Sequence, residues 1–258
     1  MLAVAVGVLG LALAGVHAAT RTPPHDGVWR PVFAKTRGLV ANELDVSSSA
    51  NRVARSPDWI VTSGSLFSDD GAAWTGPIDG RSPDPVSRIS TGSAVFRVVS
   101  RPTFLSCVVD FDLRLDSRTT TPRTPARAYD GVHVFLRYRD AWNLYVVSVA
   151  RRDGSVVVKR KEAPPGVGGT AQDDGADYVT LASATAVFPL HEWHHVTVQV
   201  SDDPRGVRLQ LAVDGRTLLD VIDEGVDGSR PLAAAGRVGL RGDNTEFHVR
   251  GLTVTPIA

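Results

Sequence analysis

The chain has 258 residues, of which 43% are hydrophobic, enough for one large all-β domain or two small domains. Its 28 basic residues balance its 28 acidic residues, so charge gives no sign of a nucleic-acid partner or of binding to an acidic membrane surface. The single cysteine, Cys107, excludes an internal disulfide. It stands in an alternating apolar row and is expected to be a small buried core residue.

An apolar run without a charge, residues 2–16, opens the chain. The run is shorter than the ~20 residues of a membrane span, and no basic residue precedes it. Residues 1–19 are therefore expected to be a signal peptide, cut before Ala19, or an uncleaved membrane anchor. Either form predicts a secreted protein or one on the extracellular face of the membrane, with membrane contact through this segment only. Residues 20–54 are expected to be a linker and a segment that wraps an edge of the domain.

Alternation of apolar and polar residues, typical of half-buried β-strands, recurs through the rest of the chain. No stretch of ten residues shows helical periodicity, and turn signals separate the alternating runs. The sequence therefore predicts an all-β sandwich or barrel over residues 55–258. The expected strands are residues 59–67, 93–100, 104–116, 193–200, 207–213, 217–222, 237–242 and 246–257, together with three central strands.

The three central strands lie within residues 129–162 and are expected to form an antiparallel meander. Asp153-Gly154 and Asp214-Gly215 are dipeptides that suit two-residue hairpin turns of type I′. The first turn predicts that Ser148 pairs with Lys159. In the first of the three strands, one face carries Val132, Val134, Leu136 and Tyr138, and the other carries His133, Phe135, Arg137 and Arg139.

The polar face of these strands resembles the floor of a groove, with small residues in the middle and cations around them. Adjacent strands of one sheet place their polar rows on the same side, so a neighbouring strand, residues 104–116, is expected to add its own polar row. Asp110, Asp112, His133, Arg137 and Lys159 are predicted to converge in one depression. The predicted ligand-binding residues are Asp110, Asp112, Arg114, His133, Phe135, Arg137, Arg152 and Lys159.

Several segments together resemble the concanavalin A-like lectin/glucanase superfamily: DWIVTSGSLF, FLSCVVDFDLRL, DGVHVFLRYRDAWNLYVVSV, HEWHHVTVQVSDDPRGVRLQLAVDGRTLLD and GRVGLRGDNTEFHVRGLTV. Within it they are most similar to laminin-G-like and keto-disaccharide-hydrolase-type domains of secreted bacterial proteins. The resemblance implies a jelly-roll sandwich of two curved antiparallel sheets that binds a glycan on its concave sheet. Glucanases of this superfamily use a Glu-x-Asp-x-x-Glu strand, and the nearest match, residues 43–48, lacks the final Glu.

Asp110 and Asp112 are the candidate catalytic residues, because side chains at i and i+2 share a strand face at a spacing that suits inverting glycoside hydrolysis. Arg114 continues the row and is expected to lower the pKa of Asp112. The alternative is a solvated strand face with a ladder of charges.

Metal binding receives little support from the sequence. Residues 191–195 have the H-E-x-x-H spacing of zinc helices, but they lead directly into a strand, so no metal ligand is assigned. No cofactor is expected. The resemblance leaves a structural calcium possible through loop acids, although the final strand carries His248 where relatives often have an acid. The candidate acids are Asp69, Asp70, Asp173, Asp174, Asp202 and Asp203.

Three functions remain open from the sequence. The leading hypothesis is an exported carbohydrate-binding, lectin-like module whose partner is a glycan or polysaccharide. The second is a glycoside-processing hydrolase that uses Asp110 and Asp112. The third is a structural or adhesion domain whose sheet faces pack against a partner.

Overall fold

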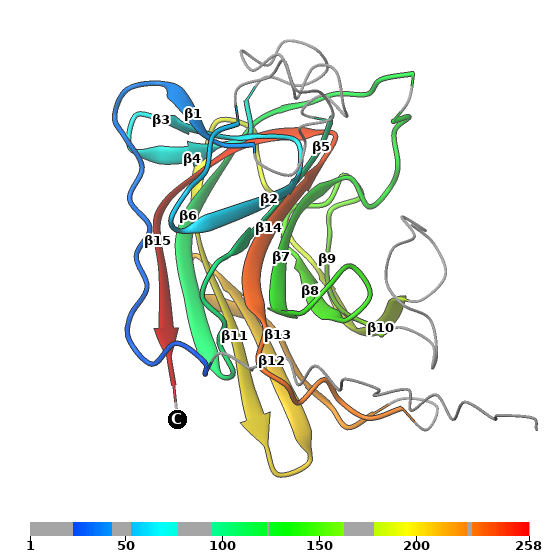
Figure 1. Cartoon of the computed structure of the whole chain (residues 1–258). Helices are drawn as coiled ribbons and strands as arrows, with labels where there is room; N and C mark the ends of the chain where they lie inside the picture. The colour runs from blue at the N-terminus through cyan, green and yellow to red at the C-terminus, as the bar shows by residue number, and fades with distance from the viewer. Residues whose placement is uncertain are drawn as a thin grey trace, which may run out of the picture.

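The structure, a computed structural model, describes residues 23–42, 53–76, 94–122, 124–162, 178–225 and 229–257. These residues form two antiparallel sheets that pack face to face, as the all-β jelly-roll prediction requires (Figure 1). The eight-stranded sheet has the order β1 (Gly38–Ala41), β3 (Leu66–Asp69), β4 (Ala72–Trp74), β15 (Thr245–Pro256), β6 (Cys107–Arg118), β11 (Trp193–Asp203), β12 (Gly206–Val213) and β13 (Arg216–Asp223). The seven-stranded sheet has the order β10 (Tyr178–Thr185), β9 (Ser155–Lys161), β8 (Leu144–Ser148), β7 (Gly131–Tyr138), β14 (Arg237–Asp243), β5 (Val95–Ser100) and β2 (Trp59–Ser63).

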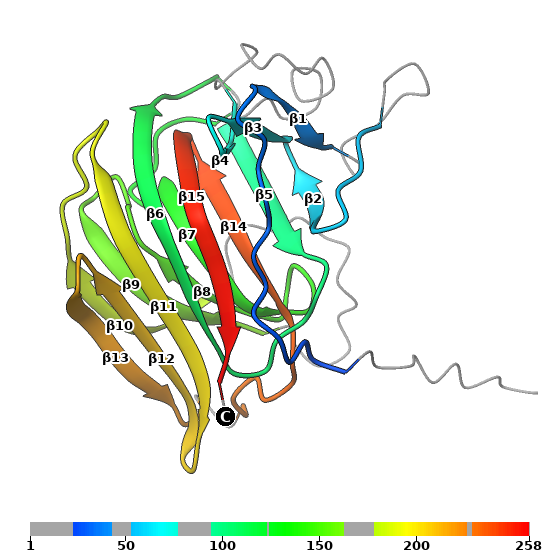
Figure 2. The same cartoon turned by 90° about the vertical axis from the view of Figure 1, so that its left-hand side faces the viewer.

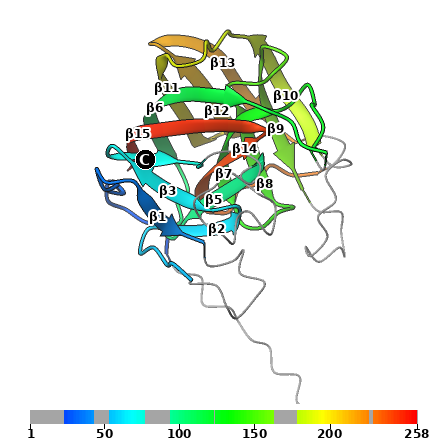
Figure 3. The same cartoon turned by 90° about the horizontal axis from the view of Figure 1, so that it is seen from above.

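The core lies between the two sheets. Figure 2 shows β15, β6 and β11 in front of β7, β8 and β14. Strand β6 alternates buried and half-buried residues along its length, and its inward row includes Val109, Phe111 and Leu113. Opposite that row, β7 and β8 contribute Val134 and Val147. The sheets also approach each other at both ends, where β10 lies near β13 and β1 lies near β2 (Figure 3).

One predicted strand is in fact two. Residues 59–67 were expected to form a single strand, but β2 belongs to the seven-stranded sheet and β3 to the eight-stranded sheet. Gly64 lies between them with a φ of 68°, a left-handed conformation that glycine adopts without steric cost. The chain therefore changes sheet at Gly64. Strands β1, β4 and β10 were not predicted, because β1 and β4 are very short and β10 is rich in small residues.

Part of the N-terminal segment packs into the sandwich. Trp29 forms a β-bridge with Val254, and its ring lies 4.8 Å from the ring of Trp59, between centroids. The ring of Phe33 also stacks on Trp59, with 6.3 Å between the ring centroids. Residues 1–22, on which the signal or anchor prediction rests, lie outside the described residues. No helix within the described ranges is long and apolar enough to cross a membrane.

The hairpin between β12 and β13 has the predicted turn. Asp214 and Gly215 both have positive φ, 51° and 76°, and Val213 pairs directly with Arg216. These are the properties of a two-residue type I′ turn. The second predicted turn is of a different kind. Gly154 N donates to Arg151 O, so Arg152 and Asp153 are the central residues and Gly154 follows them with a φ of 74°.

This longer turn changes the register of β8 and β9. Ser148 pairs with Val157, not with Lys159 as predicted. The register differs from the prediction by two residues, and because side chains alternate with a period of two, the predicted faces of the residues within β8 and β9 survive. Tyr145, Val147 and Val158 face the core, whereas Ser148 and Lys159 face outward.

A β-bulge interrupts β7 near its end. Gly239 of β14 pairs with Phe135 and Arg237 pairs with Tyr138, so two residues of β7 lie opposite one residue of β14. Arg137, inside this bulge, has a φ of 49°. The extra residue reverses the alternation, as bulges do. Arg137 therefore points inward, and Tyr138 lies on the outer face, where its ring stacks on Phe135 at 5.6 Å.

Candidate functional site

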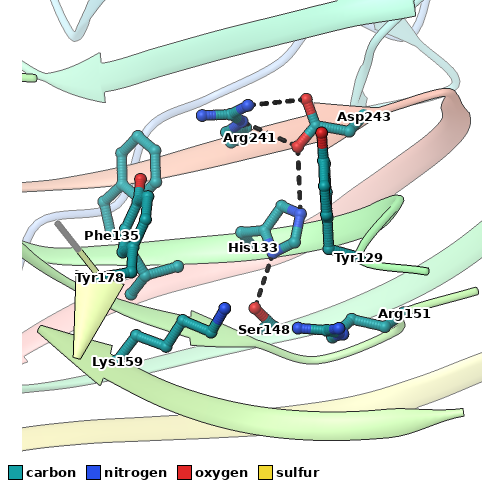
Figure 4. A pocket seen from close by; sticks show the side chains of 10 residues that line it. Tyr129, His133, Phe135, Ser148, Arg151, Lys159, Tyr178, Arg241 and Asp243 are labelled. Atoms are coloured by element: carbon teal, nitrogen blue, oxygen red, sulfur yellow. Dashed lines mark hydrogen bonds and ion pairs between the residues drawn. The ribbon is translucent and has the colours of Figure 1, made fainter. Parts of the chain in front are cut away.

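A pocket of about 330 Å³ opens on the outer face of the seven-stranded sheet (Figure 4). The strands that form its floor each turn their polar row outward, while their apolar row faces the core. Its walls combine aromatic rings with charged and hydroxyl groups. The lining residues are Tyr129, His133, Phe135, Val146, Ser148, Arg151, Lys159, Tyr178, Arg241 and Asp243.

A line of polar side chains crosses the floor from β8 through β7 to β14. Ser148 Oγ lies 2.8 Å from Nδ1 of His133, and Nε2 of the same imidazole lies 3.2 Å from Oδ2 of Asp243. Arg241 then holds Asp243 with two bonds, Nε to Oδ2 at 2.8 Å and Nη2 to Oδ1 at 3.0 Å (Figure 4). The line fixes the orientation of the imidazole at the centre of the floor.

Burial and neighbouring charges set the protonation states of this line. Burial lowers the pKa of His133, and the carboxylate of Asp243 only partly offsets that effect. Burial would raise the pKa of Asp243, but Arg241 and His133 outweigh it and hold the pKa below its usual range. A neutral imidazole therefore faces an ionised carboxylate. With the ring proton on Nε2 toward Asp243, Nδ1 is an acceptor for the Ser148 hydroxyl.

Aromatic rings form the side of the pocket near β10. The ring of Phe135 stacks on the ring of Tyr138, with an angle of 8° between the two ring planes. Tyr178 begins β10, and the ammonium of Lys159 lies 5.6 Å from the centroid of its ring. Tyr129 stands on the opposite side of the pocket (Figure 4). Flat apolar rings beside hydroxyl and charged groups suit a ligand with one apolar face and many hydroxyls.

The predicted convergence of acidic and basic residues in one depression is wrong. His133, Phe135 and Lys159 do line one pocket. Asp110, Asp112 and Arg114 belong to β6 in the other sheet, where their side chains lie on the outer face away from the core. Local alternation showed two faces for each strand, but it did not show that β6 and β7 belong to different sheets.

On β6, the two candidate catalytic carboxylates have partners of their own. Thr197 donates to Asp110 at 2.7 Å, and Asp112 contacts His195 at 3.0 Å and Arg250 at 3.1 Å. Partial burial opposes ionisation of Asp112, but hydrogen bonds with His195 and Arg250 hold its pKa below the usual range. The pKa of Asp112 is lowered, as predicted, but Arg114 is not the cause, because it pairs with Asp116 instead.

Arg137 and Arg152 are not part of the pocket. The Arg137 side chain is fully buried and donates to Leu105 O, to Leu232 O and to Asp202. Its assignment to the ligand groove is a wrong prediction, and the bulge in β7 is the reason. Arg152 donates to Asp130 and to Thr119 O at the end of the loop. The neighbouring residue, Arg151, lines the pocket in its place because the turn is longer than expected.

Six lining residues were missed from the sequence: Tyr129, Val146, Arg151, Tyr178, Arg241 and Asp243. Alternation could have found Arg241 and Asp243. They stand two residues apart and alternate with the apolar residues Val238 and Leu240, so they fall on the opposite strand face. Tyr178 was missed because its strand, β10, is rich in small residues and was not predicted from the sequence.

The acids and histidines considered for metals mostly have other partners. His194 lies 2.8 Å from Asp214, and His195 is paired with Asp112 on the opposite strand face. Asp69 pairs with Arg37 and His248, and Asp202 pairs with Arg137. No group of three or more metal-binding side chains occurs in the part of the chain that the structure describes. Residues 173, 174 and 43–48 lie outside that part.

No family model matches the chain, and no curated protein matches it in sequence. Among solved structures, the carbohydrate binding module CBM66 from Bacillus subtilis superposes with a TM-score of 0.52 at 13% identity, over 76% of this chain and 94% of that one. The Emp46p carbohydrate recognition domain, in its potassium-bound form, has a TM-score of 0.50 at 12% identity, over 85% of this chain and 97% of that one. A putative glycosyl hydrolase from Parabacteroides distasonis reaches a TM-score of 0.44 at 10% identity, over 78% and 88%.

At these identities, the first two likenesses establish the fold alone. They agree with the jelly roll that the resemblance to the concanavalin A-like superfamily implied. Membership of the laminin-G-like or keto-disaccharide-hydrolase-type families stays a prediction. The chain folds as a jelly-roll sandwich of the architecture found in the carbohydrate-binding module and the carbohydrate recognition domain.

Proposed function

We propose that the protein is a carbohydrate-binding, lectin-like module that holds part of a glycan in the pocket on the seven-stranded sheet. The observation that carries the proposal is the meeting of aromatic rings, Phe135 and Tyr178, with hydroxyl and charged groups in one pocket. Sugar rings present apolar C–H faces and hydroxyl edges, and such a pocket complements both. Two of the structures that superpose on this chain, a carbohydrate-binding module and a carbohydrate recognition domain, are of the same functional class, which supports the proposal.

Binding without hydrolysis fits the charges of the described residues better than catalysis does. Glycosidases usually need two carboxyl groups that flank the scissile bond, one of them protonated. Asp243 is the single carboxylate among the described residues that line the pocket, and Arg241 holds it ionised. Asp112 is likewise held ionised, on the opposite side of the molecule, so it is a poor proton donor. The hydrolase hypothesis thus has no acid–base pair among the described residues that line the pocket.

The proposal includes export, which rests on the apolar run at residues 2–16. Export is consistent with a glycan ligand, because most extended polysaccharides that such a module would meet lie outside the cell. Fractionation of cells that express the full chain, followed by N-terminal sequencing of the mature protein, tests this part. A protein retained in the cytoplasm with Met1 intact would contradict it.

The test of the function is a glycan array probed with the purified full chain, followed by incubation with each glycan bound. The proposal predicts binding to a restricted set of glycans, with no release of reducing ends or of a modified sugar. Product release would identify the hydrolase alternative as correct. Failure to bind any glycan, with folding verified by circular dichroism, would favour the adhesion alternative.

A further inference from the structure

The charges of the described residues that line the pocket do not cancel. Three cationic side chains, Arg151, Lys159 and Arg241, line it together with one carboxylate, Asp243. His133 does not add to the positive charge, because burial favours its neutral form. The excess of positive charge is a property of the pocket that carbohydrate binding in general does not require, since neutral sugars carry no charge.

Both arginines are already neutralised. Arg241 forms a two-bonded pair with Asp243. Arg151 forms a similar pair with Asp153, Nε to Oδ1 at 3.2 Å and Nη2 to Oδ2 at 2.7 Å. Two-bonded pairs between guanidinium and carboxylate satisfy charge and geometry together. Neither arginine is therefore the origin of the excess charge.

Lys159 is the cation that remains. No carboxylate of the described residues lies within ion-pair distance of its ammonium group, which instead contacts the ring of Tyr178. It is also partly withdrawn from water, and burial, with Arg151 nearby, lowers its pKa. A cation that is desolvated without a carboxylate partner is unfavourable, and an anionic ligand would remove that cost.

We propose that the pocket selects acidic glycans, and that Lys159 binds the carboxylate or sulfate of the sugar. This inference rests on the proposed function of the same pocket. One sugar face would lie against Tyr178 and Phe135, while the anionic substituent faces Lys159 across the floor beside Ser148 (Figure 4). A volume of about 330 Å³ is at the small end of ligand pockets, which are about 300–1,000 Å³, and suits a terminal acidic sugar better than a long chain segment.

Lysine is a point charge, so it does not distinguish a carboxylate from a sulfate by geometry. Two pairs of probes separate these sources. Oligogalacturonate and its methyl ester differ by the carboxylate charge, and chondroitin sulfate and its desulfated form differ by the sulfate. Calorimetric titration of the full chain with all four is expected to show at least about tenfold tighter binding of the member that carries the additional anionic group, in one pair or both, the scale of one charged hydrogen bond.

Variants then test the role of Lys159. Lys159→Gln is expected to remove the preference for the member with the additional anionic group, and Lys159→Arg is expected to retain it. Arg139→Gln, which removes an exposed cation just after the end of β7 and outside the pocket lining, is the matched control and should change nothing. Thermal midpoints of all variants verify folding, and the probe comparison on the unaltered chain does not depend on any variant.

The outcomes separate this inference from the proposed function. If the protein binds neutral glycans as tightly as acidic ones, or if the preference persists in Lys159→Gln, the acidic selection is wrong and the pocket is a neutral sugar site. If no glycan binds at all, the proposed function itself is wrong. Tighter binding of an acidic glycan that weakens as salt is raised supports both.

Discussion

Arg137 lies on a strand whose outward residues line the pocket, yet its guanidinium is buried between the sheets. It satisfies two backbone carbonyls, of Leu105 and Leu232, and pairs with Asp202. Its contacts join β7 to the segment before β6 and to β11, so it ties the two sheets together. Its role is therefore structural, and its removal should affect folding rather than ligand affinity.

Arg137→Met should lower the free energy of unfolding by about 3 kcal/mol, because buried carbonyls lose their donor. Arg139→Met, two residues along and exposed, is the matched control and should stay within about 0.5 kcal/mol. Urea denaturation of both variants measures the difference. Equal stability of the two variants would show that the inward position of Arg137 is wrong.

His133 makes stability depend on pH. Its folded pKa lies below the ~6.5 of the unfolded chain, because burial opposes the imidazolium. The unfolded state therefore binds more protons below about pH 6.5, and the free energy of unfolding falls as pH drops through that value. Asp243, whose folded pKa is also depressed, adds a further loss near and below its unfolded pKa of about 3.9.

The histidine contribution can be isolated with His133→Gln, which cannot titrate. Between pH 7 and pH 5, its free energy of unfolding should fall less steeply than that of the unaltered chain. His191→Asn, at an exposed position with positive φ, should keep the original slope. Chemical denaturation at several pH values provides the measurement. Parallel slopes for the unaltered chain and His133→Gln would contradict the buried neutral imidazole.

At the scale of elements, the segment around Trp29 behaves as part of the sandwich. Trp29 packs against Trp59 and Phe104, and its indole N–H donates to Asp58. Trp29→Ala should lower the free energy of unfolding by about 3 kcal/mol, the lower range for loss of a buried aromatic. Val32→Ala, in the same segment but 88% exposed, should have almost no effect. If both substitutions were neutral in thermal unfolding, the segment would be only a linker.

The alternation of residues was enough to predict most strands, most of the strand faces and one hairpin. Strand β6 was expected from its row of Leu, Cys, Val and Phe, and Asp214-Gly215 has the expected turn. What alternation does not contain is pairing between strands far apart in sequence. The sequence showed that β6 has a polar face, but its neighbours, β15 and β11, lie more than 70 residues away along the chain.

The same limit applies to the candidate site. His133, Phe135 and Lys159 were predicted because they share one face of neighbouring strands, and the structure brings them together. Asp110 and Asp112 were added on the assumption that β6 joins the same sheet, which it does not. Arg137 was assigned by a strict period of two, and a β-bulge with positive φ gives no reliable local signal.

The whole molecule has two outer faces of different character. The face of the seven-stranded sheet contains the pocket, with Tyr178 at its aromatic side. The face of the eight-stranded sheet carries an exposed network of ion pairs, in which Arg114 and Arg250 lie over the ring of Trp193 at 4.9 Å and 4.0 Å. Each face thus has an aromatic residue in contact with cations, and the two rings offer a direct comparison.

Calorimetric titration of Tyr178→Ala and Trp193→Ala with a glycan that binds the unaltered chain compares these faces directly. If the glycan occupies the pocket, Tyr178→Ala should weaken affinity about tenfold, the scale of one aromatic contact of about 1.4 kcal/mol, and Trp193→Ala should leave it unchanged. Loss of affinity in Trp193→Ala with full retention in Tyr178→Ala would place the glycan on the eight-stranded sheet and contradict the pocket as the binding site.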